Sequence, residues 1–61
     1  MTREEFEKLK VGDKVRHPFG GIGVVVEKDN MTYVVRDKSF GDNGEVCFAW
    51  NEGKVVNELK K

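Results

Sequence analysis

Cys47 and His17 are the side chains of this sequence that could act as a nucleophile and its base. A catalytic cysteine needs a neighbouring base, and the base needs a third group that orients it. Cys47 lies in an apolar run, where a free cysteine usually behaves as a small hydrophobic residue. His17 precedes Pro18, which favours an extended backbone, so His17 is predicted to cap the first strand. No third group is evident, and we expect a protein that is not an enzyme.

The same residues and one glycine-rich segment bear on metal and cofactor binding. One cysteine cannot close an internal disulfide, and one cysteine with one histidine cannot complete a four-ligand zinc site. Gly20-Gly21-Ile22-Gly23 resembles the start of a phosphate-binding loop. A dinucleotide fingerprint needs a third glycine at the opening of a helix, whereas the sixth position here is Val26, in a predicted strand. The sequence therefore predicts no metal and no cofactor.

Several aromatic side chains are candidates for a recognition surface. Phe19 and Phe40 lie in predicted loops, where an exposed ring would need a functional reason. Such rings can form a cage for a methylated cation or stack on bases. The candidate aromatic patch consists of Phe19, Tyr33, Phe40 and Trp50. The alternative is structural, because periodicity also places Phe6, Phe48 and Trp50 in a core.

Charge is balanced over the whole chain but divided along it. The 61 residues carry 11 basic and 11 acidic side chains, so the net charge of zero excludes a generic polycation. Residues 8–38 carry a net charge of +3, and residues 39–59 carry a net charge of −3. We expect a basic patch on the early strands with an acidic rim near the last two turns, the alternative being scattered solvated charges. The patch would consist of Lys14, Arg16, Arg36 and Lys38.

The pattern of glycines and β-formers predicts the elements that position these groups. The first nine residues favour a short helix, since Thr2 and Glu5 have the spacing of a capping box and Phe6 and Leu9 share a face. Seven glycines separate runs rich in valine and aromatic residues, which is typical of strands and turns. The predicted strands are Lys14–His17, Ile22–Lys28, Met31–Arg36, Glu45–Trp50 and Lys54–Val56, with a further helical turn over Asn57–Leu59.

Short strands in one small chain predict an all-β domain. Residues 1–61 form one domain: a helical turn in 1–10, a five-stranded, partly open SH3-like (Tudor-like) barrel in 11–59 and a tail in 60–61. An OB-fold is disfavoured because the loop 37–44 is too short and glycine-rich for its helix. Two-residue turns at Asp29–Asn30 and a left-handed Gly53 would join the strands. Strand Glu45–Trp50 has no strongly polar face, which suits a central position or a closed barrel.

One stretch carries a resemblance to a known family. Residues 11–25 read VGDKVRHPFGGIGVV. This resembles the opening of the RNA polymerase-interaction domain of CarD-type regulators and the transcription-repair coupling factor, and of the C-terminal Tudor-like domain of UvrD/PcrA helicases. The resemblance implies a small barrel that contacts the β subunit of bacterial RNA polymerase, in the CarD type partly by pairing sheet edges.

We therefore expect a non-enzymatic protein-binding module that uses a strand edge and a basic patch. The expected partner-binding residues are Lys14, Arg16, Phe19, Tyr33, Arg36, Lys38 and Phe40. One alternative is an SH3-like protein that binds single-stranded nucleic acid, and another is a small phage or mobile-element protein that inhibits a host complex. The longest apolar run is Val24–Val26, too short for a membrane span, so no membrane partner and a cytoplasmic location are expected.

Overall fold

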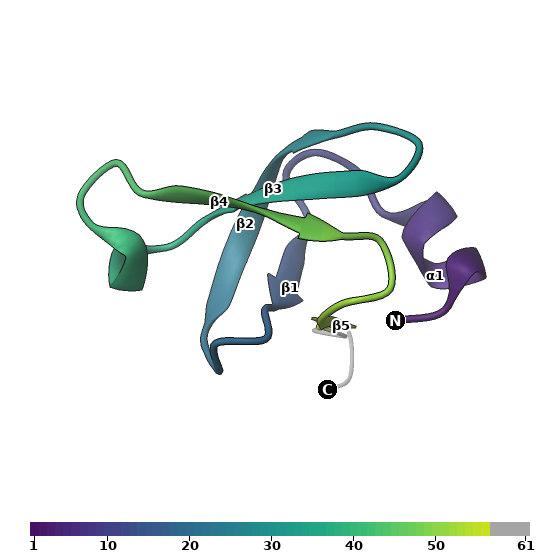
Figure 1. Cartoon of the computed structure of the whole chain (residues 1–61), viewed down its shortest axis with the longest axis horizontal. Helices are drawn as coiled ribbons and strands as arrows, with labels where there is room; N and C mark the ends of the chain where they lie inside the picture. The colour runs from purple at the N-terminus through teal and green to yellow at the C-terminus, as the bar shows by residue number, and fades with distance from the viewer. Residues whose placement is uncertain (57–61) are drawn as a thin grey trace.

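The computed structural model describes residues 1–56, which form a short helix followed by an antiparallel sheet (Figure 1). Its elements are α1 (Arg3–Lys8), β1 (Lys14–Arg16), β2 (Ile22–Lys28), β3 (Thr32–Arg36), the 3-10 turn η1 (Lys38–Phe40), β4 (Glu45–Ala49) and β5 (Lys54–Val55). The all-β prediction is confirmed, and each predicted strand is present to within one residue at either end. The turn predicted over Asn57–Leu59 lies outside the described residues.

Helix α1 begins as the sequence predicts. The Thr2 hydroxyl accepts the backbone N–H of Glu5 at 3.1 Å, and the Glu5 carboxylate accepts the backbone N–H of Thr2 at 2.9 Å. This capping box satisfies donors that the first helical turn leaves open. Phe6 and Leu9 are both buried, so α1 covers one end of the apolar core.

The strands are ordered β4-β3-β2-β1-β5 in the sheet, and the pairs with a determined register are all antiparallel. The β2–β3 turn differs from the prediction, because within residues 1–56 no residue other than glycine has a positive φ. Instead, the Asp29 carboxylate accepts the backbone N–H groups of Met31 and Thr32 at 2.9 and 2.8 Å. An aspartate can thus hold a hairpin turn through its side chain, and β3 begins one residue later.

The two end strands of this sheet are joined by a short loop, residues 50–53. In a flat five-stranded sheet β4 and β5 would lie about 19 Å apart, while this connection spans at most about 17 Å when extended. The loop is in fact folded, because the Glu52 N–H donates to the Ala49 carbonyl at 3.0 Å. The predicted left-handed Gly53 is confirmed, with φ of 79°. The sheet is therefore curled, with one inner and one outer face.

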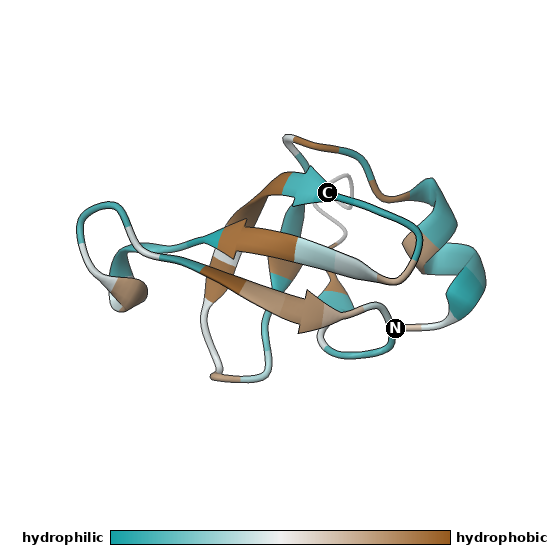
Figure 2. Cartoon of the chain, turned by 45° about the horizontal axis from the view of Figure 1, so that its top comes forward, coloured by the Kyte–Doolittle hydropathy of each residue, from teal (hydrophilic) through white to brown (hydrophobic). Residues whose placement is uncertain are grey.

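The inner face of the curled sheet holds the core. Val15, Val25 and Val35 are fully buried there; Tyr33 contacts Phe6 of α1, and Phe48 contacts Tyr33 on one side and His17 on the other. Lys28 joins the helix to the sheet: its ammonium lies 4.7 Å from the centre of the Phe6 ring and donates to the Leu9 carbonyl at 2.7 Å. Figure 2 shows hydrophobic stretches along the strands and hydrophilic residues on most of α1 and the loops.

The position of β4 excludes one of the two alternatives expected for this strand, the central position. Glu45–Ala49 is an end strand that pairs with β3 alone among residues 1–56, and not a central strand. The sequence pattern of β4 suggested a central strand because Cys47 and Ala49 are apolar although they are exposed, while Val46 and Phe48 face the core. Small apolar side chains on an exposed face imitate the composition of a strand that is covered on both faces.

The Tyr33 hydroxyl ties the sheet to the loop 50–53, which gives a first testable prediction. It donates to the Glu52 carbonyl at 2.6 Å, and burial together with the negative charge of Glu52 raises the pKa of Tyr33 from 10.0 to about 12. We expect Tyr33→Phe to lower the free energy of unfolding by about 1 kcal/mol in urea titrations at neutral pH. Phe48→Leu, which leaves this bond intact, serves as a packing control.

The same residue predicts an alkaline transition. Because the folded pKa is raised, the stability that Tyr33 contributes is complete below pH 10.0 and is lost as the pH rises towards about 12. Tyr33 is the one tyrosine of the chain, so phenolate absorbance reports on it alone. Ionisation near pH 10.0 in a chain that stays folded would contradict this assignment.

Candidate functional site

The outer face of the sheet brings together cations and apolar side chains from four strands. Strand register places Arg16 between Lys54 of β5 and Ile22 of β2. A second row runs Lys14, Val24, Arg36 and Glu45 from β1 to β4. Side chains directly opposite on neighbouring strands lie about 4.5–5.5 Å apart, so the two rows form one continuous surface.

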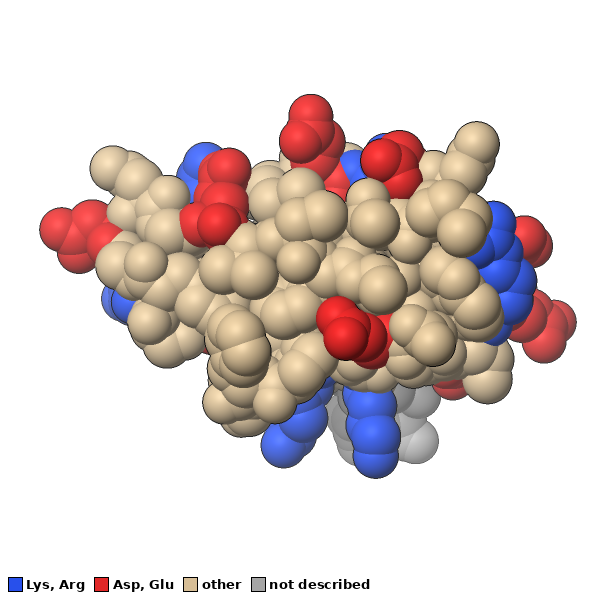
Figure 3. All heavy atoms as spheres, in the orientation of Figure 1, with Lys and Arg blue, Asp and Glu red and all other residues tan. Residues whose placement is uncertain are grey.

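Two hydrophobic side chains at the middle of this surface are exposed to solvent. Ile22 is 45% exposed and Val24 is 37% exposed, although both lie in the longest strand of the sheet. Arg16 and Lys14 stand directly opposite them on β1. We call Lys14, Arg16, Ile22, Val24 and Lys54 the outer-face patch. Lys and Arg side chains project from the lower edge of the molecule in Figure 3, below β1 and β5.

The predicted basic patch is therefore present in part and rearranged. Lys14, Arg16 and Arg36 share the outer face, but the Arg36 guanidinium donates to the Glu45 carboxylate at 2.6 Å and is neutralised there. Lys38 lies in η1, outside the strands. Lys54, and not Lys38, lies beside Arg16 on the outer face. The sum of charges along the sequence did not reveal this, because Lys54 falls in the acidic segment.

The two loop aromatics are brought together at the end of the β1–β2 hairpin. Phe19 is 70% exposed, and its ring meets the half-buried Phe40 edge-on with centroids 5.9 Å apart. Both rings pack on His17, at 6.0 Å from Phe19 and 4.7 Å from Phe40. His17 in turn stacks parallel to the core ring of Phe48. Phe19 is thus an exposed apolar side chain whose ring is held in place by contacts with His17 and Phe40.

The other two members of the predicted aromatic patch lie elsewhere. Tyr33 is fully buried on the inner face, so it cannot contribute to a surface. Tyr33 shares its face of β3 with Val35, whereas Val34 lies on the other face with the polar Thr32 and Arg36. This alternation was the signal in the sequence that Tyr33 points inwards. Trp50 packs on Phe6 with ring centroids 6.4 Å apart, at the end of the core covered by α1.

His17 has a structural role, as predicted, but its burial and its pairing with Asp37 were not predicted. Its side chain is almost wholly inaccessible, and its Nε2 bonds the Asp37 carboxylate at 2.5 Å. Its Nδ1 is buried without a hydrogen-bond partner among residues 1–56. The sequence did hold a signal, since Val15 and His17 are two apart and must share the inward face of β1.

Gly21 explains part of the glycine-rich motif. A Cβ there would lie 2.7 Å from an Asp37 carboxylate oxygen and 3.0 Å from His17 Nε2, so any side chain would disturb this pair. Residues 22–28 then continue as strand β2, and no helix opens at the motif. The motif thus has a structural explanation: Gly21 and Gly23 allow close packing, and Gly20 takes a positive φ of 100° in the turn.

The structure also separates the two candidate catalytic residues. Cys47 is exposed on the outer face of β4, whereas His17 stacks on Phe48, whose side chain faces the core. Neighbouring residues of a strand point to opposite faces, so the two side chains form no dyad. Cys47 is not the packing thiol that the sequence suggested. Among residues 1–56 no three His, Cys, Asp or Glu side chains gather to hold a metal ion.

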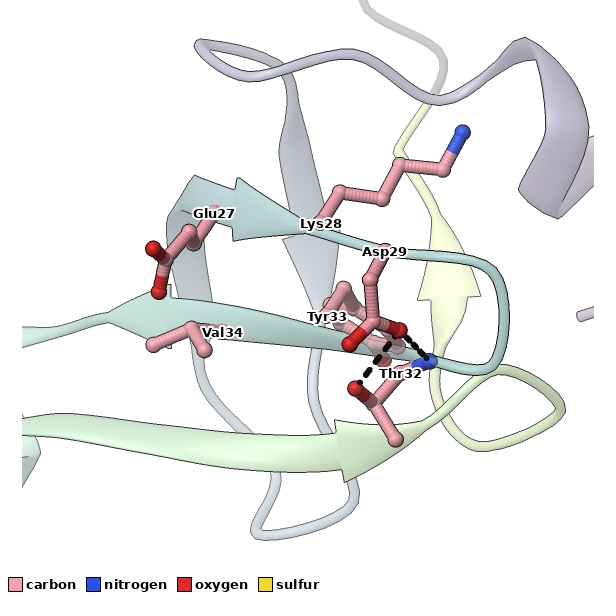
Figure 4. A pocket seen from close by; sticks show the side chains of 6 residues that line it. All are labelled: Glu27, Lys28, Asp29, Thr32, Tyr33 and Val34. Carbon is pink, nitrogen blue, oxygen red and sulfur yellow. Dashed lines mark hydrogen bonds between the residues drawn. The ribbon is translucent and has the colours of Figure 1, made fainter.

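A shallow pocket of about 200 Å³ lies beside the β2–β3 hairpin (Figure 4). Two of its polar side chains already have partners: Asp29 holds the turn, and Lys28 reaches towards α1. Tyr33 contributes to its wall while its hydroxyl is bonded to Glu52. The pocket thus follows from the geometry of the hairpin.

Comparisons with protein-family models, with curated proteins and with solved structures gave no match. In the described part of the chain, no helix has the length and apolar character needed to cross a membrane. The assignment of a function therefore depends on the surfaces described above.

The His17–Asp37 pair makes a prediction about the acid side of stability. The hydrogen bond from His17, supported by one from the Ser39 hydroxyl, lowers the pKa of Asp37 below 3.8. The stability that this carboxylate contributes is therefore present above pH 3.8 and is lost as the pH falls through the lower folded value. Urea unfolding should show Asp37→Ala to be destabilised at neutral pH and less sensitive to acid.

The matched control is Ser39→Ala, which removes one hydrogen bond to Asp37 but leaves His17 paired. We expect it to cost less than Asp37→Ala, because a buried ring that loses its partner costs about 1–3 kcal/mol. Equal losses for the two variants would mean that the pair with His17 does not hold this loop.

Proposed function

We propose that this chain is a non-enzymatic protein-binding module that docks an acidic segment of a partner on its outer-face patch. The observation that carries the proposal is the exposure of Ile22 and Val24 between the cations of β1 and β5. The fold leaves 45% of Ile22 and 37% of Val24 exposed to solvent. A partner surface would bury them.

The chemistry of the patch defines the partner. Interfaces combine an apolar centre with a polar rim, and opposite charges steer and orient the encounter. Ile22 and Val24 would form the centre, while Arg16 and Lys54 would meet carboxylates at the rim. The complementary ligand is an extended segment with a hydrophobic residue flanked by Asp or Glu.

On the basis of the resemblance of residues 11–25, we propose the β subunit of bacterial RNA polymerase as that partner. The strand order supports an SH3-like interpretation, since β5 returns to β1 and the sheet is curled. The edge strand nearest the patch is β5, so docking would combine the outer face with a strand edge. A small phage or mobile-element protein that occupies a host surface would use the same patch.

Charge reversal at the centre of the patch tests this proposal. In titrations of purified RNA polymerase β subunit, followed by calorimetry, we expect Arg16→Glu to weaken binding at least about tenfold, because it sets like charges against each other. Lys8→Glu changes the net charge equally but lies on α1, away from the patch, and should bind as the unmodified chain does. Equal binding by both variants would reject the patch.

The exposed ring of Phe19 supports a second candidate function, the binding of single-stranded nucleic acid. A ring that is 70% exposed next to Phe40 offers a stacking platform for a base, near the cations of β1. Arg16 and Lys38 would then contact phosphates.

A salt series separates the two functions. Nucleic-acid affinity falls steeply with salt because bound counterions are released, whereas docking with an apolar centre loses much less. Using a fluorescent oligothymidylate and the β subunit in parallel, we expect measurable affinity for the protein that changes little with salt. Tight oligothymidylate binding that vanishes with added salt and with Phe19→Ala would favour the second function.

A further inference from the structure

The backbone of edge strand β4 leaves hydrogen-bonding groups facing away from the sheet. The Trp50 N–H donates to the Met31 carbonyl at 2.8 Å, and the Asp37 N–H donates to the Gly44 carbonyl at 3.4 Å. Bonded pairs alternate along an antiparallel ladder, so residues 44, 46, 48 and 50 bond to β3. The N–H and C=O groups of Glu45, Cys47 and Ala49 therefore point outwards.

Both backbone groups of Ala49 already form hydrogen bonds with Glu52, in the loop that follows β4. Its N–H donates to the Glu52 carboxylate at 3.2 Å, and its carbonyl accepts the Glu52 N–H at 3.0 Å. Within residues 1–56, the outward N–H and C=O groups of Glu45 and Cys47 have no such hydrogen bond. The open part of the edge is thus the short segment from Glu45 to Cys47.

This edge lacks the features that usually prevent pairing with another strand. Natural edge strands are protected by lysine, proline, bulges or extreme shortness. β4 has five residues, contains neither lysine nor proline, and pairs with β3 without a register shift. Its single charge, on Glu45, is neutralised by Arg36.

We propose that two copies of this chain associate by antiparallel pairing of their β4 edges about a two-fold axis at Val46. In this register Glu45 of each copy exchanges N–H···O bonds with Cys47 of the other. All the open groups are used, and Ala49 keeps its bonds to Glu52. An axis at Cys47 would instead set Glu45 opposite Ala49, whose groups are already occupied.

Charge also favours a second copy as the occupant. Glu45 stands opposite the uncharged Cys47 of the other copy, so no like charges face each other directly. The net charge of the chain is zero, so the two copies do not repel each other as wholes.

The combined sheet would end in two β5 strands of two residues each, too short to extend it further. Pairing therefore stops at a dimer. β4 and β5 lie at opposite ends of the sheet, so this inference is independent of the proposed function.

Sedimentation equilibrium over a range of concentrations tests the proposal. We expect the weight-average mass to rise from 7.0 kDa towards twice that value. Cys47→Pro removes an outward N–H and leaves the ladder to β3 intact, so it should remain monomeric while its circular dichroism and unfolding stay native-like. Cys47→Ser keeps the N–H and should dimerise like the unmodified chain. A constant monomer mass for the unmodified chain, or equal association of Cys47→Pro, would overturn the proposal.

Cross-linking provides a second measurement that does not depend on the proline variant. The two Cys47 side chains would lie diagonally across the pair, about 7–8 Å apart, within reach of a short bis-maleimide. We expect a covalent dimer from the unmodified chain. The control is Cys47→Ser combined with Val24→Cys, which moves the single thiol to β2 on the same face. Equal cross-linking of the control would show random collision and contradict pairing through β4.

Discussion

The short connection between the two end strands is the constraint on which the rest of the structure depends. Residues 50–53 cannot cross the width of a flat sheet, so the sheet must curl until β5 can pair with β1. The Tyr33 hydroxyl and the left-handed Gly53 fix this connection against the inner face. Curling divides the strands into an enclosed face and an open one, and this division determines the role of almost every side chain.

The inner face is explained by folding alone, and the outer face is not. Val15, Val25, Val35 and Tyr33 are apolar because they exclude water, while His17 is tolerated there because Asp37 bonds it. Ile22 and Val24 stay partly exposed on the outer face, and the ring of Phe19 is exposed although it packs on His17 and Phe40. These exposed apolar groups lie among cations and beside a hairpin tip, which favours a docking surface over a catalytic cavity. The unprotected edge of β4 is a separate feature at the other end of the sheet.

Local patterns were enough to predict the elements of this fold. The capping box of Thr2 and Glu5, the inward Val15 and the left-handed Gly53 follow from neighbours within a few residues. The fold class followed from the spacing of glycines between β-forming runs. The closure of the curled sheet as a barrel, and the relation of residues 11–25 to RNA polymerase-binding modules, stay predictions.

The candidate site could not be predicted in the same way, because it is formed by strand pairing between residues that are distant in the sequence. Local sequence patterns do not reveal such pairing. Lys54 joins Arg16 because β5 returns to β1, and Arg36 is neutralised because β4 places Glu45 opposite it. Tyr33 was assigned to the surface together with the loop aromatics, although it shares a face of its strand with the buried Val35. Cys47 was assigned to the interior because its strand has no strongly polar face. Each correction follows from knowing which face of the sheet is enclosed.

Cross-saturation in solution would identify the residues of this chain that a bound partner covers. The isotope-labelled chain would be mixed with unlabelled RNA polymerase β subunit, and saturation of the subunit would be read out on the amides of the small domain. The account predicts that transfer concentrates on Arg16, Ile22, Val24 and Lys54. Transfer confined to Phe19 and Phe40, or no transfer to the outer face, would contradict it.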